Sequence, residues 1–183
     1  DDDFVITQSM SFVATTNAIS HVGAVPHFVD IESHSFGMSY KALESRLNDI
    51  AYKKDGEVFN KETGRRIAAV LPVHVFGNPA EIPELLKIKS DWGIPIVEDA
   101  CHALGASYGY KKKQVMIGSC KHSDLATFST HPVKSITTGE GGIVTTNKKF
   151  YYERLKKFRS HGIERDSRFP WQYDIFNTGY NYR

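Results

Sequence analysis

The sequence has little cysteine, no long apolar run and almost no net charge. Its two cysteines, Cys101 and Cys120, form no CxxC pair, which argues against a disulfide framework and against a zinc motif. No apolar stretch approaches the roughly 20 residues of a membrane span, and the acidic start lacks the basic region of a signal peptide. Lysine and arginine (23) nearly balance aspartate and glutamate (21), so charge predicts no nucleic-acid partner and no membrane partner. These features predict a cytoplasmic protein without a bound metal.

What the sequence does contain is a regular alternation of short strands and helices. With 183 residues, 40% of them hydrophobic, the chain can bury one sizeable core. Ser39 is a suitable N-cap for one predicted helix, and Gly93 ends another. Such strands, linked by helices, are typical of an α/β domain whose mainly parallel sheet is covered by helices. The predicted strands are 4–7, 25–29, 67–75, 94–97, 125–128 and 143–146, and the predicted helices are 13–21, 40–48 and 81–91.

A polar segment, residues 51–66, interrupts this alternation. The turn sequence Asp55-Gly56 predicts a surface hairpin inserted before a strand. Its lysines and arginines form either a phosphate-binding patch or, more commonly, a solvated face. A second basic run, residues 111–113, is expected at a hairpin tip.

Two residues suggest chemistry when they are considered together. Lys134 lies in a loop of small residues that ends in glycines, and Asp99 follows an apolar strand. Alone, a lysine is usually a surface charge, and a carboxylate after a strand is more often a helix cap. Together they would emerge at the carboxyl edge of a parallel sheet, where open α/β sheets bind ligands. Pyridoxal phosphate requires this pair, a lysine for the Schiff base and an acid that keeps the pyridine nitrogen protonated.

Other residues near this pair could complete a cofactor pocket. His102, three residues after Asp99, could line it, and Ser129 has a hydroxyl and a nearby backbone amide suited to phosphate.

Seven blocks of the sequence, in order, resemble the DegT/DnrJ/EryC1/StrS sugar aminotransferases. The resemblance implies a fold type I, aspartate-aminotransferase-like large domain. It runs through nearly the whole chain, except for residues 51–66 and 164–177. The blocks are residues 9–19, 25–30, 72–77, 97–106, 128–142, 159–162 and 179–183.

The resemblance also implies roles for individual residues around the cofactor. Lys134 would bind the cofactor and later move a proton between substrate and cofactor carbons. Asp99 would bind the pyridine nitrogen, Phe12 would stack on the ring, and His102 would support its other side. Without the resemblance, Phe12 would be taken for an ordinary core aromatic.

Three further residues receive roles from the same resemblance. Ser129 would hold the cofactor phosphate, and His131, otherwise an ordinary loop histidine, would contact the substrate. Asn181 would reach the phosphate of the neighbouring subunit's cofactor, which implies a homodimer with shared active sites.

The sequence also departs from the family pattern. Residues 1–183 correspond to part of the large pyridoxal phosphate-binding domain, without the family's preceding phosphate-loop segment and its small C-terminal domain, so the chain is expected to be a fragment. Thr130 replaces an aromatic residue common at its position. Lys134 argues against the dehydratase members, which have histidine there.

The implied reaction transfers an amino group from glutamate to the 4-keto carbon of a nucleotide-linked deoxysugar. The blocks favour a UDP-linked 4-keto-6-deoxy-N-acetylhexosamine used for cell-surface polysaccharide or nonulosonic acid synthesis, with GDP-perosamine synthesis as an alternative. A fold type I lyase or desulfurase would share the lysine and aspartate, but a desulfurase needs a mobile nucleophilic cysteine. A non-catalytic binding module built on a decayed aminotransferase would be expected to lose Lys134 or Asp99.

Overall fold

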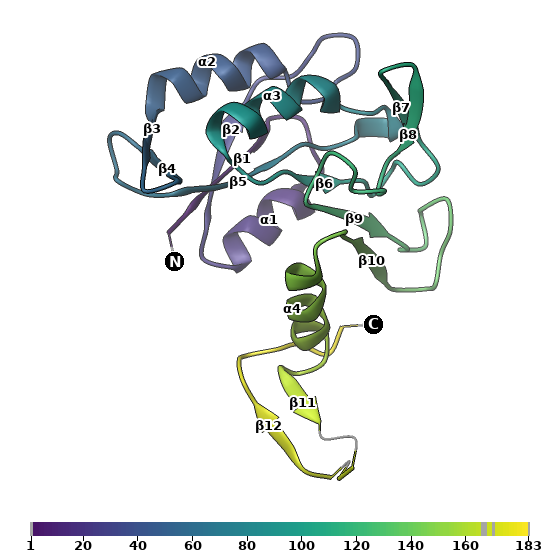
Figure 1. Ribbon diagram of the computed structural model, residues 1–183. Helices are drawn as coiled ribbons and strands as arrows, with labels where there is room; N and C mark the ends of the chain where they lie inside the picture. Colours follow the sequence, from purple (N-terminus) through teal and green to yellow (C-terminus); the bar gives the residue numbers. More distant parts are fainter. Residues whose placement is uncertain (1, 166–167, 170, 183) are drawn as a thin grey trace.

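A computed structural model describes residues 2–165, 168–169 and 171–182, and its centre is a twisted sheet (Figure 1). Hydrogen-bonded ladders join the strands in the orders β2-β1-β5 and β10-β9-β6. Isolated parallel bridges, Val70 to Ile96 and Val73 to Asp99, connect β5 with β6, so the two ladders form one sheet. The strands are β1 (Phe4–Gln8), β2 (Val25–Val29), β5 (Ile67–Leu71), β6 (Val97–Asp99), β9 (Leu125–Ser129) and β10 (Gly142–Thr145).

The direction of these strands decides where a site can form. The pairs β1–β2, β1–β5 and β6–β9 are parallel, and only the pairing of β10 with β9 is antiparallel. The carboxyl ends of β1, β5, β6 and β9 therefore meet at one edge of the sheet. This edge is where open α/β sheets bind ligands.

Helices cover the sheet on both faces (Figure 1). Helix α1 (Val13–His21) lies on one face, and α2 (Tyr40–Ile50) and α3 (Ile82–Trp92) lie on the other. Ser39 Oγ accepts the Ala42 amide hydrogen and caps α2, and Gly93 ends α3 in the left-handed conformation with φ of 75°. The predicted covered α/β sheet is confirmed.

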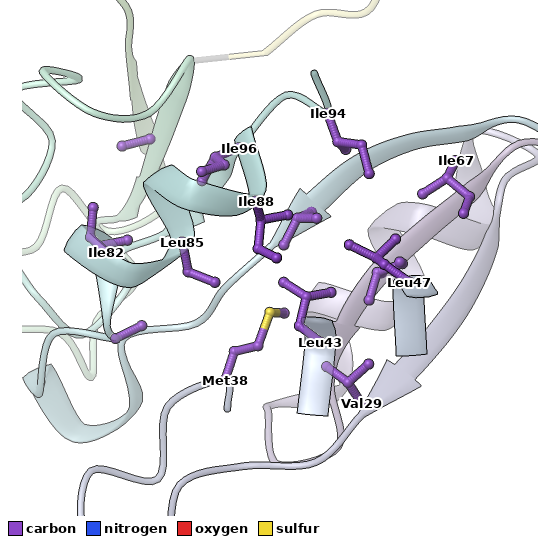
Figure 2. Packing of buried hydrophobic residues seen from close by; sticks show 14 of the residues in the cluster. Val29, Met38, Leu43, Leu47, Ile67, Ile82, Leu85, Ile88, Ile94 and Ile96 are labelled. Carbon is purple, nitrogen blue, oxygen red and sulfur yellow. The ribbon is translucent and has the colours of Figure 1, made fainter. Parts of the chain in front are cut away.

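The main core lies between the sheet and the α2–α3 layer (Figure 2). Leu43 and Leu47 of α2 and Leu85 of α3 are fully buried there. Their spacing of three or four residues gives each helix an apolar stripe that faces the strands. Burying each such side chain contributes about 1.5–3 kcal/mol, and together they fix the sheet that carries the site.

Two hairpins lie outside the central sheet. Strands β3 (Ala51–Lys54) and β4 (Glu57–Asn60) are antiparallel around Asp55 and Gly56, as predicted. Strands β7 (Ser107–Tyr110) and β8 (Lys113–Met116) place the second basic run at a hairpin tip, also as predicted. Arg66 near the first hairpin pairs with Asp3 and Glu57, which favours a solvated, ion-paired face over a phosphate patch.

The C-terminal part projects away from the sheet (Figure 1). It contains α4 (Lys149–Arg159) and the antiparallel strands β11 (Ile163–Arg165) and β12 (Tyr173–Ile175). Helix α4 buries none of its side chains in the described part of the chain.

Two predicted strand boundaries were wrong. The strand predicted at 67–75 ends at Leu71, because Pro72 has no amide hydrogen for the ladder, and residues 75–77 form the 3-10 turn η1 (Val75–Gly77). The strand predicted at 94–97 instead runs from Val97 to Asp99 and is preceded by a single bridge at Ile96. Among the described residues, no helix combines the length and apolarity required to cross a bilayer.

Candidate active site

The candidate site lies at the carboxyl edge of the parallel strands. Here β1 leads through Phe12 into α1, β6 ends at Asp99, and β9 ends at Ser129. The backbone couples these ends directly, because the Ala100 N–H donates to the Thr127 carbonyl oxygen at 2.8 Å. The topology thus brings together loops that are far apart in the sequence.

Both carboxylate oxygens of Asp99 accept a hydrogen bond from this chain. The Cys101 backbone N–H donates to Oδ1 at 3.1 Å, and the Thr15 hydroxyl donates to Oδ2 at 2.7 Å. A carboxylate offers about four lone-pair positions, so each oxygen keeps capacity for one further donor. Asp99 itself is half-buried, at the edge of the sheet.

Lys134 lies in the loop between β9 and β10. Its backbone N–H donates to the His131 carbonyl oxygen at 2.9 Å, which closes a tight turn. The base of the loop is held by Thr130 and Thr138, whose hydroxyls are 2.8 Å apart, and by the Thr138 amide bonded to the Thr130 carbonyl at 3.0 Å. The lysine is half-buried while its loop neighbours on both sides are exposed.

Electrostatics connect the lysine to the neighbourhood of Asp99. Burial raises the pKa of the Cys101 thiol to about 12, and the charge and hydrogen bond of Asp99 add to this shift. The Lys134 ammonium acts in the opposite direction on the same thiol. Lys134 is therefore within electrostatic reach of the residue that holds Asp99 Oδ1.

Ser129 and His131 lie at the start of the same loop. Ser129 Oγ accepts the His131 amide hydrogen at 3.3 Å, and its own hydrogen remains available for an external acceptor. The His131 ring is exposed, and its Nδ1 accepts the Val133 amide hydrogen at 3.4 Å. His131 thus has a local role in the turn, and its contact with a substrate stays a prediction.

Phe12 and His102 occupy neighbouring loops at this edge. Phe12 is the N-cap residue of α1 and is 73% exposed, so it is not the ordinary core aromatic of the alternative interpretation. His102 is exposed in the turn after β6, where its carbonyl oxygen closely approaches Gly77, so that a Cβ at Gly77 would be only 3.0 Å away. The structure thus brings Phe12, Asp99, His102, Ser129 and Lys134 to one edge.

Asn181 is the predicted site residue that the structure does not bring to this edge. It lies in the projecting C-terminal part, bridged to Ser160 beside a cavity of about 460 Å³. That Asn181 reaches the phosphate of a neighbouring subunit's cofactor stays a prediction. Arg183, the end of the same sequence block, lies outside the described residues.

Sequence reasoning missed two sets of polar residues that support the site. One is Thr15 with Ser11, whose hydroxyls are 2.7 Å apart beside Asp99. The other is a buried network in which His74 Nε2 lies 2.8 Å from Glu98 Oε2, and Ser123 Oγ donates to Glu98 Oε1. Glu98 and Asp99 are adjacent on β6 and point to opposite faces of the sheet. The alternation of side chains along a strand could therefore have indicated that, if Asp99 belongs to the site, Glu98 belongs to the buried face.

The buried network also fixes the histidine tautomer. His74 Nδ1 accepts the Ala80 amide hydrogen at 2.9 Å, so the proton of the neutral ring is on Nε2 and is donated to Glu98. The His74 amide donates to the Asp99 carbonyl oxygen at 3.0 Å. A buried network whose members are hydrogen-bonded therefore holds the backbone of Asp99 in place.

The residues at this edge fit pyridoxal phosphate in their chemistry. Asp99 has acceptor capacity for a pyridine N–H, and Lys134 provides an amine. Ser129 provides a hydroxyl donor, and Phe12 provides an exposed aromatic face. These are the groups that a pyridoxal phosphate site requires for ring, carbonyl carbon and phosphate.

Known proteins match the chain over its whole length. The model of the DegT/DnrJ/EryC1/StrS aminotransferase family matches residues 1–183. A UDP-4-amino-4,6-dideoxy-N-acetyl-beta-L-altrosamine transaminase of Campylobacter jejuni is 37% identical over 182 residues, covering 100% of this chain and 43% of that protein. A GDP-perosamine synthase of Escherichia coli O157:H7 is 30% identical over 183 residues, with the same coverage of 100% and 43%.

A solved structure supports the same relationship. PseC of Helicobacter pylori, an aminotransferase involved in the biosynthesis of pseudoaminic acid, has a TM-score of 0.77 and 30% identity, and the match covers 100% of this chain and 43% of PseC. The fold is therefore that of the fold type I, pyridoxal phosphate-dependent aminotransferases. The chain spans 43% of the length of the curated relatives it matches. With sequence, fold and site in agreement, the chain belongs to the DegT/DnrJ/EryC1/StrS aminotransferase family.

Proposed function

We propose that this chain carries the cofactor-binding part of a pyridoxal phosphate-dependent nucleotide-sugar aminotransferase. The reaction moves an amino group from glutamate to the 4-keto carbon of a nucleotide-linked 4-keto-6-deoxy sugar. The observation that carries the proposal is the convergence of Asp99 and Lys134 at one sheet edge, with Asp99 hydrogen-bonded on both oxygens and Lys134 within electrostatic reach of Cys101. A decayed binding module would have no reason to keep both.

The cofactor supplies an electron sink that stabilises the negative charge left when a proton leaves the carbon bearing the amino group. Asp99 would accept a hydrogen bond from the pyridine nitrogen, and the charge of its carboxylate would favour the protonated ring. Lys134 Nζ would hold the cofactor and, as a free amine, would move a proton as a general base and acid. In this second role the amine must be neutral when it accepts the proton.

The other site residues orient the cofactor. The Ser129 hydroxyl would donate to its phosphate, and Phe12 and His102, both exposed at this edge, would pack against the pyridine ring. His131, two residues after Ser129 and hydrogen-bonded to its hydroxyl oxygen, would contact the substrate. Rigid orientation matters because the bond to be broken must align with the electron sink.

For the sugar, we propose a UDP-linked 4-keto-6-deoxy-N-acetylhexosamine, used for cell-surface polysaccharide or nonulosonic acid synthesis. The support is the 37% identity with the UDP-sugar transaminase of C. jejuni and the fold match to PseC. A GDP-linked perosamine precursor is the second candidate, favoured by the 30% identity with the GDP-perosamine synthase. We also propose a cytoplasmic location, which the two free thiols, Cys101 and Cys120, support because that compartment is reducing.

We also propose that the active protein is a homodimer in which Asn181 completes the partner subunit's phosphate site. The position of Asn181 in the projecting C-terminal part supports this, as does the absence of buried side chains on α4 within the described chain.

The test uses the full-length polypeptide with pyridoxal phosphate, glutamate and each keto-sugar nucleotide, and it measures the aminated sugar by mass spectrometry. We expect product with the UDP sugar, and Lys134→Ala should lower the rate by at least about 10³-fold because no other group moves the proton at that position. Borohydride reduction should fix the cofactor to a peptide containing Lys134. The matched control is Lys41→Ala, an exposed lysine on α2.

The outcomes separate the candidates. Product with only the GDP sugar would replace the first substrate by the second. Cofactor reduced onto a different lysine would overturn the assignment of Lys134. If the full-length protein retained no cofactor at all, the binding-module alternative would replace the enzyme.

A further inference from the structure

We infer that Thr15 is a positioning residue for the cofactor-binding carboxylate, acting through Asp99 without touching the cofactor itself. The inference rests on the proposed function and deepens it. Thr15 lies 84 residues from Asp99 in the sequence, yet its hydroxyl and Asp99 Oδ2 are 2.7 Å apart.

The donor direction of this contact is determined by chemistry. An ionised carboxylate only accepts, so the single Thr15 hydroxyl hydrogen points to Asp99 Oδ2. The contact between Ser11 Oγ and Thr15 Oγ1, 2.7 Å, must then use the Ser11 hydrogen, which shares its donation with the more distant Phe12 carbonyl oxygen at 3.2 Å. The three groups form a one-way chain in which Ser11 donates to Thr15 and Thr15 donates to Asp99, and each bond polarises the next.

The rotamer of Thr15 is fixed by its surroundings. The residue is 7% exposed in the first turn of α1, and its amide donates to the Phe12 carbonyl oxygen at 3.1 Å. A β-branched side chain in a helix has few accessible rotamers. The first turn of helix α1 is thus the support from which the hydroxyl reaches Asp99.

The same contact ties Asp99 to the residue that would stack on the cofactor ring. Phe12 precedes α1 directly, so the orientation of its ring and that of the carboxylate depend on one helix start. With Cys101 N–H on Oδ1 and Thr15 on Oδ2, rotation of the Asp99 carboxyl would break two hydrogen bonds. At metal sites, loss of a bond that supports a ligating residue costs about 10- to 100-fold in affinity or activity, and the same order is expected here.

The experiment compares Thr15→Val with Thr15→Ser in the full-length, cofactor-loaded protein. Valine keeps the shape and removes the hydroxyl, and we expect the cofactor dissociation constant to rise about tenfold and kcat to fall about tenfold, with KM for glutamate little changed. Circular dichroism in the cofactor absorbance band should change, because it reports how the ring is held. Thr15→Ser should restore all three readouts.

Two controls distinguish positioning from general damage. Thr16→Val makes the same exchange at the next helix position, which has no side-chain hydrogen bond in the described part of the chain, and it should leave the readouts unchanged. Thr15→Val should also add almost nothing to the loss caused by Asp99→Asn, since residues that act through one another are not additive. Equal losses in both backgrounds would overturn the inference.

A folding defect and a failure of the proposed function give different results. If Thr15→Val does not fold, Ser11→Ala tests the same chain one bond earlier, and the inference predicts a loss of about two- to threefold in cofactor affinity; no loss would overturn it. If wild-type protein binds no cofactor, the proposed function fails with it. If wild type is active while Thr15→Val matches it, only the role of Thr15 fails.

Discussion

At the scale of single residues, the Cys101 thiol separates two classes of pyridoxal phosphate enzyme. Burial raises its pKa to about 12, and the neighbouring Asp99 charge and hydrogen bond reinforce the shift. A desulfurase requires a mobile thiolate nucleophile, whereas the high pKa keeps the Cys101 thiol protonated beside Asp99. Cys120, the other cysteine, is buried. The chemistry of the cysteines therefore disfavours the desulfurase alternative.

We predict that iodoacetamide modifies Cys101 very slowly at pH 8. With a pKa of about 12, only about one thiol in ten thousand is ionised at that pH. Mass spectrometry of the native protein from pH 7 to 9 would measure the rate, with the urea-unfolded protein as the control in which both cysteines react. Rapid modification of native Cys101 at pH 7 would contradict the high pKa.

At the scale of elements, one buried carboxylate joins three segments around the site. Asp124 is 2% exposed, its Oδ2 accepts hydrogen bonds from Lys89 Nζ of α3 at 2.7 Å and from the Ile96 amide at 2.9 Å, and Lys148, at the start of α4, pairs with its other oxygen. The Asp124 amide returns a bond to the Ile96 carbonyl oxygen at 2.8 Å. This residue thus sets how α3 and α4 meet the strands that carry Asp99 and Ser129.

We predict that Asp124 makes stability depend on pH. Burial alone raises its pKa, but the hydrogen bonds from Lys148, Lys89 and the Ile96 amide outweigh burial, so the pKa is lowered from 3.8. Because the folded pKa is the lower one, the stabilisation is present above about pH 4 and is lost as the pH falls through the folded value. Asp124→Asn should cost about 1–3 kcal/mol at pH 7.

Urea unfolding at several pH values would measure this contribution. The difference between wild type and Asp124→Asn should shrink as the pH falls below about 4, because the wild-type carboxyl then becomes neutral too. Asp55→Asn, at an exposed hairpin turn, is the matched control. A difference that stayed constant with pH would mean that packing, not charge, accounts for the loss.

At the scale of the whole molecule, the residues predicted for the site lie in two places, the sheet edge and the projecting C-terminal part. Lys134 and Asp99 lie at the edge, and Asn181 lies beside Ser160 at the end of α4. A homodimer with shared sites would pair the lysine of one subunit with the asparagine of the other. If sites are shared in this way, Asn181 must lie apart from Lys134 and Asp99 within one subunit, as it does here.

Mixed dimers of two variants would test this sharing. Lys134→Ala and Asn181→Ala should each be impaired alone, whereas a heterodimer contains one site with both residues intact. We therefore predict that co-refolded variants exceed the average activity of the two separate samples. Activity equal to that average would indicate that each site takes both residues from one subunit.

The local features of this protein follow from residues that are neighbours in the sequence. The Ser39 cap, the Gly93 stop and the Asp55-Gly56 turn are set by neighbouring residues, so the positions of α2, α3 and the β3–β4 hairpin were predicted correctly, whereas α4 was not predicted. The prediction that Lys134 and Asp99 lie at one sheet edge followed from cofactor chemistry and from the rule that the carboxyl ends of parallel strands lie at one edge. The end of β5 was predicted wrongly, because Pro72 interrupts the hydrogen-bonded ladder, and the ladder depends on strands that are distant in the sequence.

The side chains that support the site come together only in the three-dimensional fold. Thr15 meets Asp99 across 84 residues, His74 meets Glu98 across 24, and Asp124 meets Lys89 across 35. Each contact depends on strand order and on which face of a strand or helix a side chain occupies, and local periodicity encodes the face but not the partner. Burial then makes an unpaired polar group costly, so the fold itself selects the partners that hold the carboxylates in place.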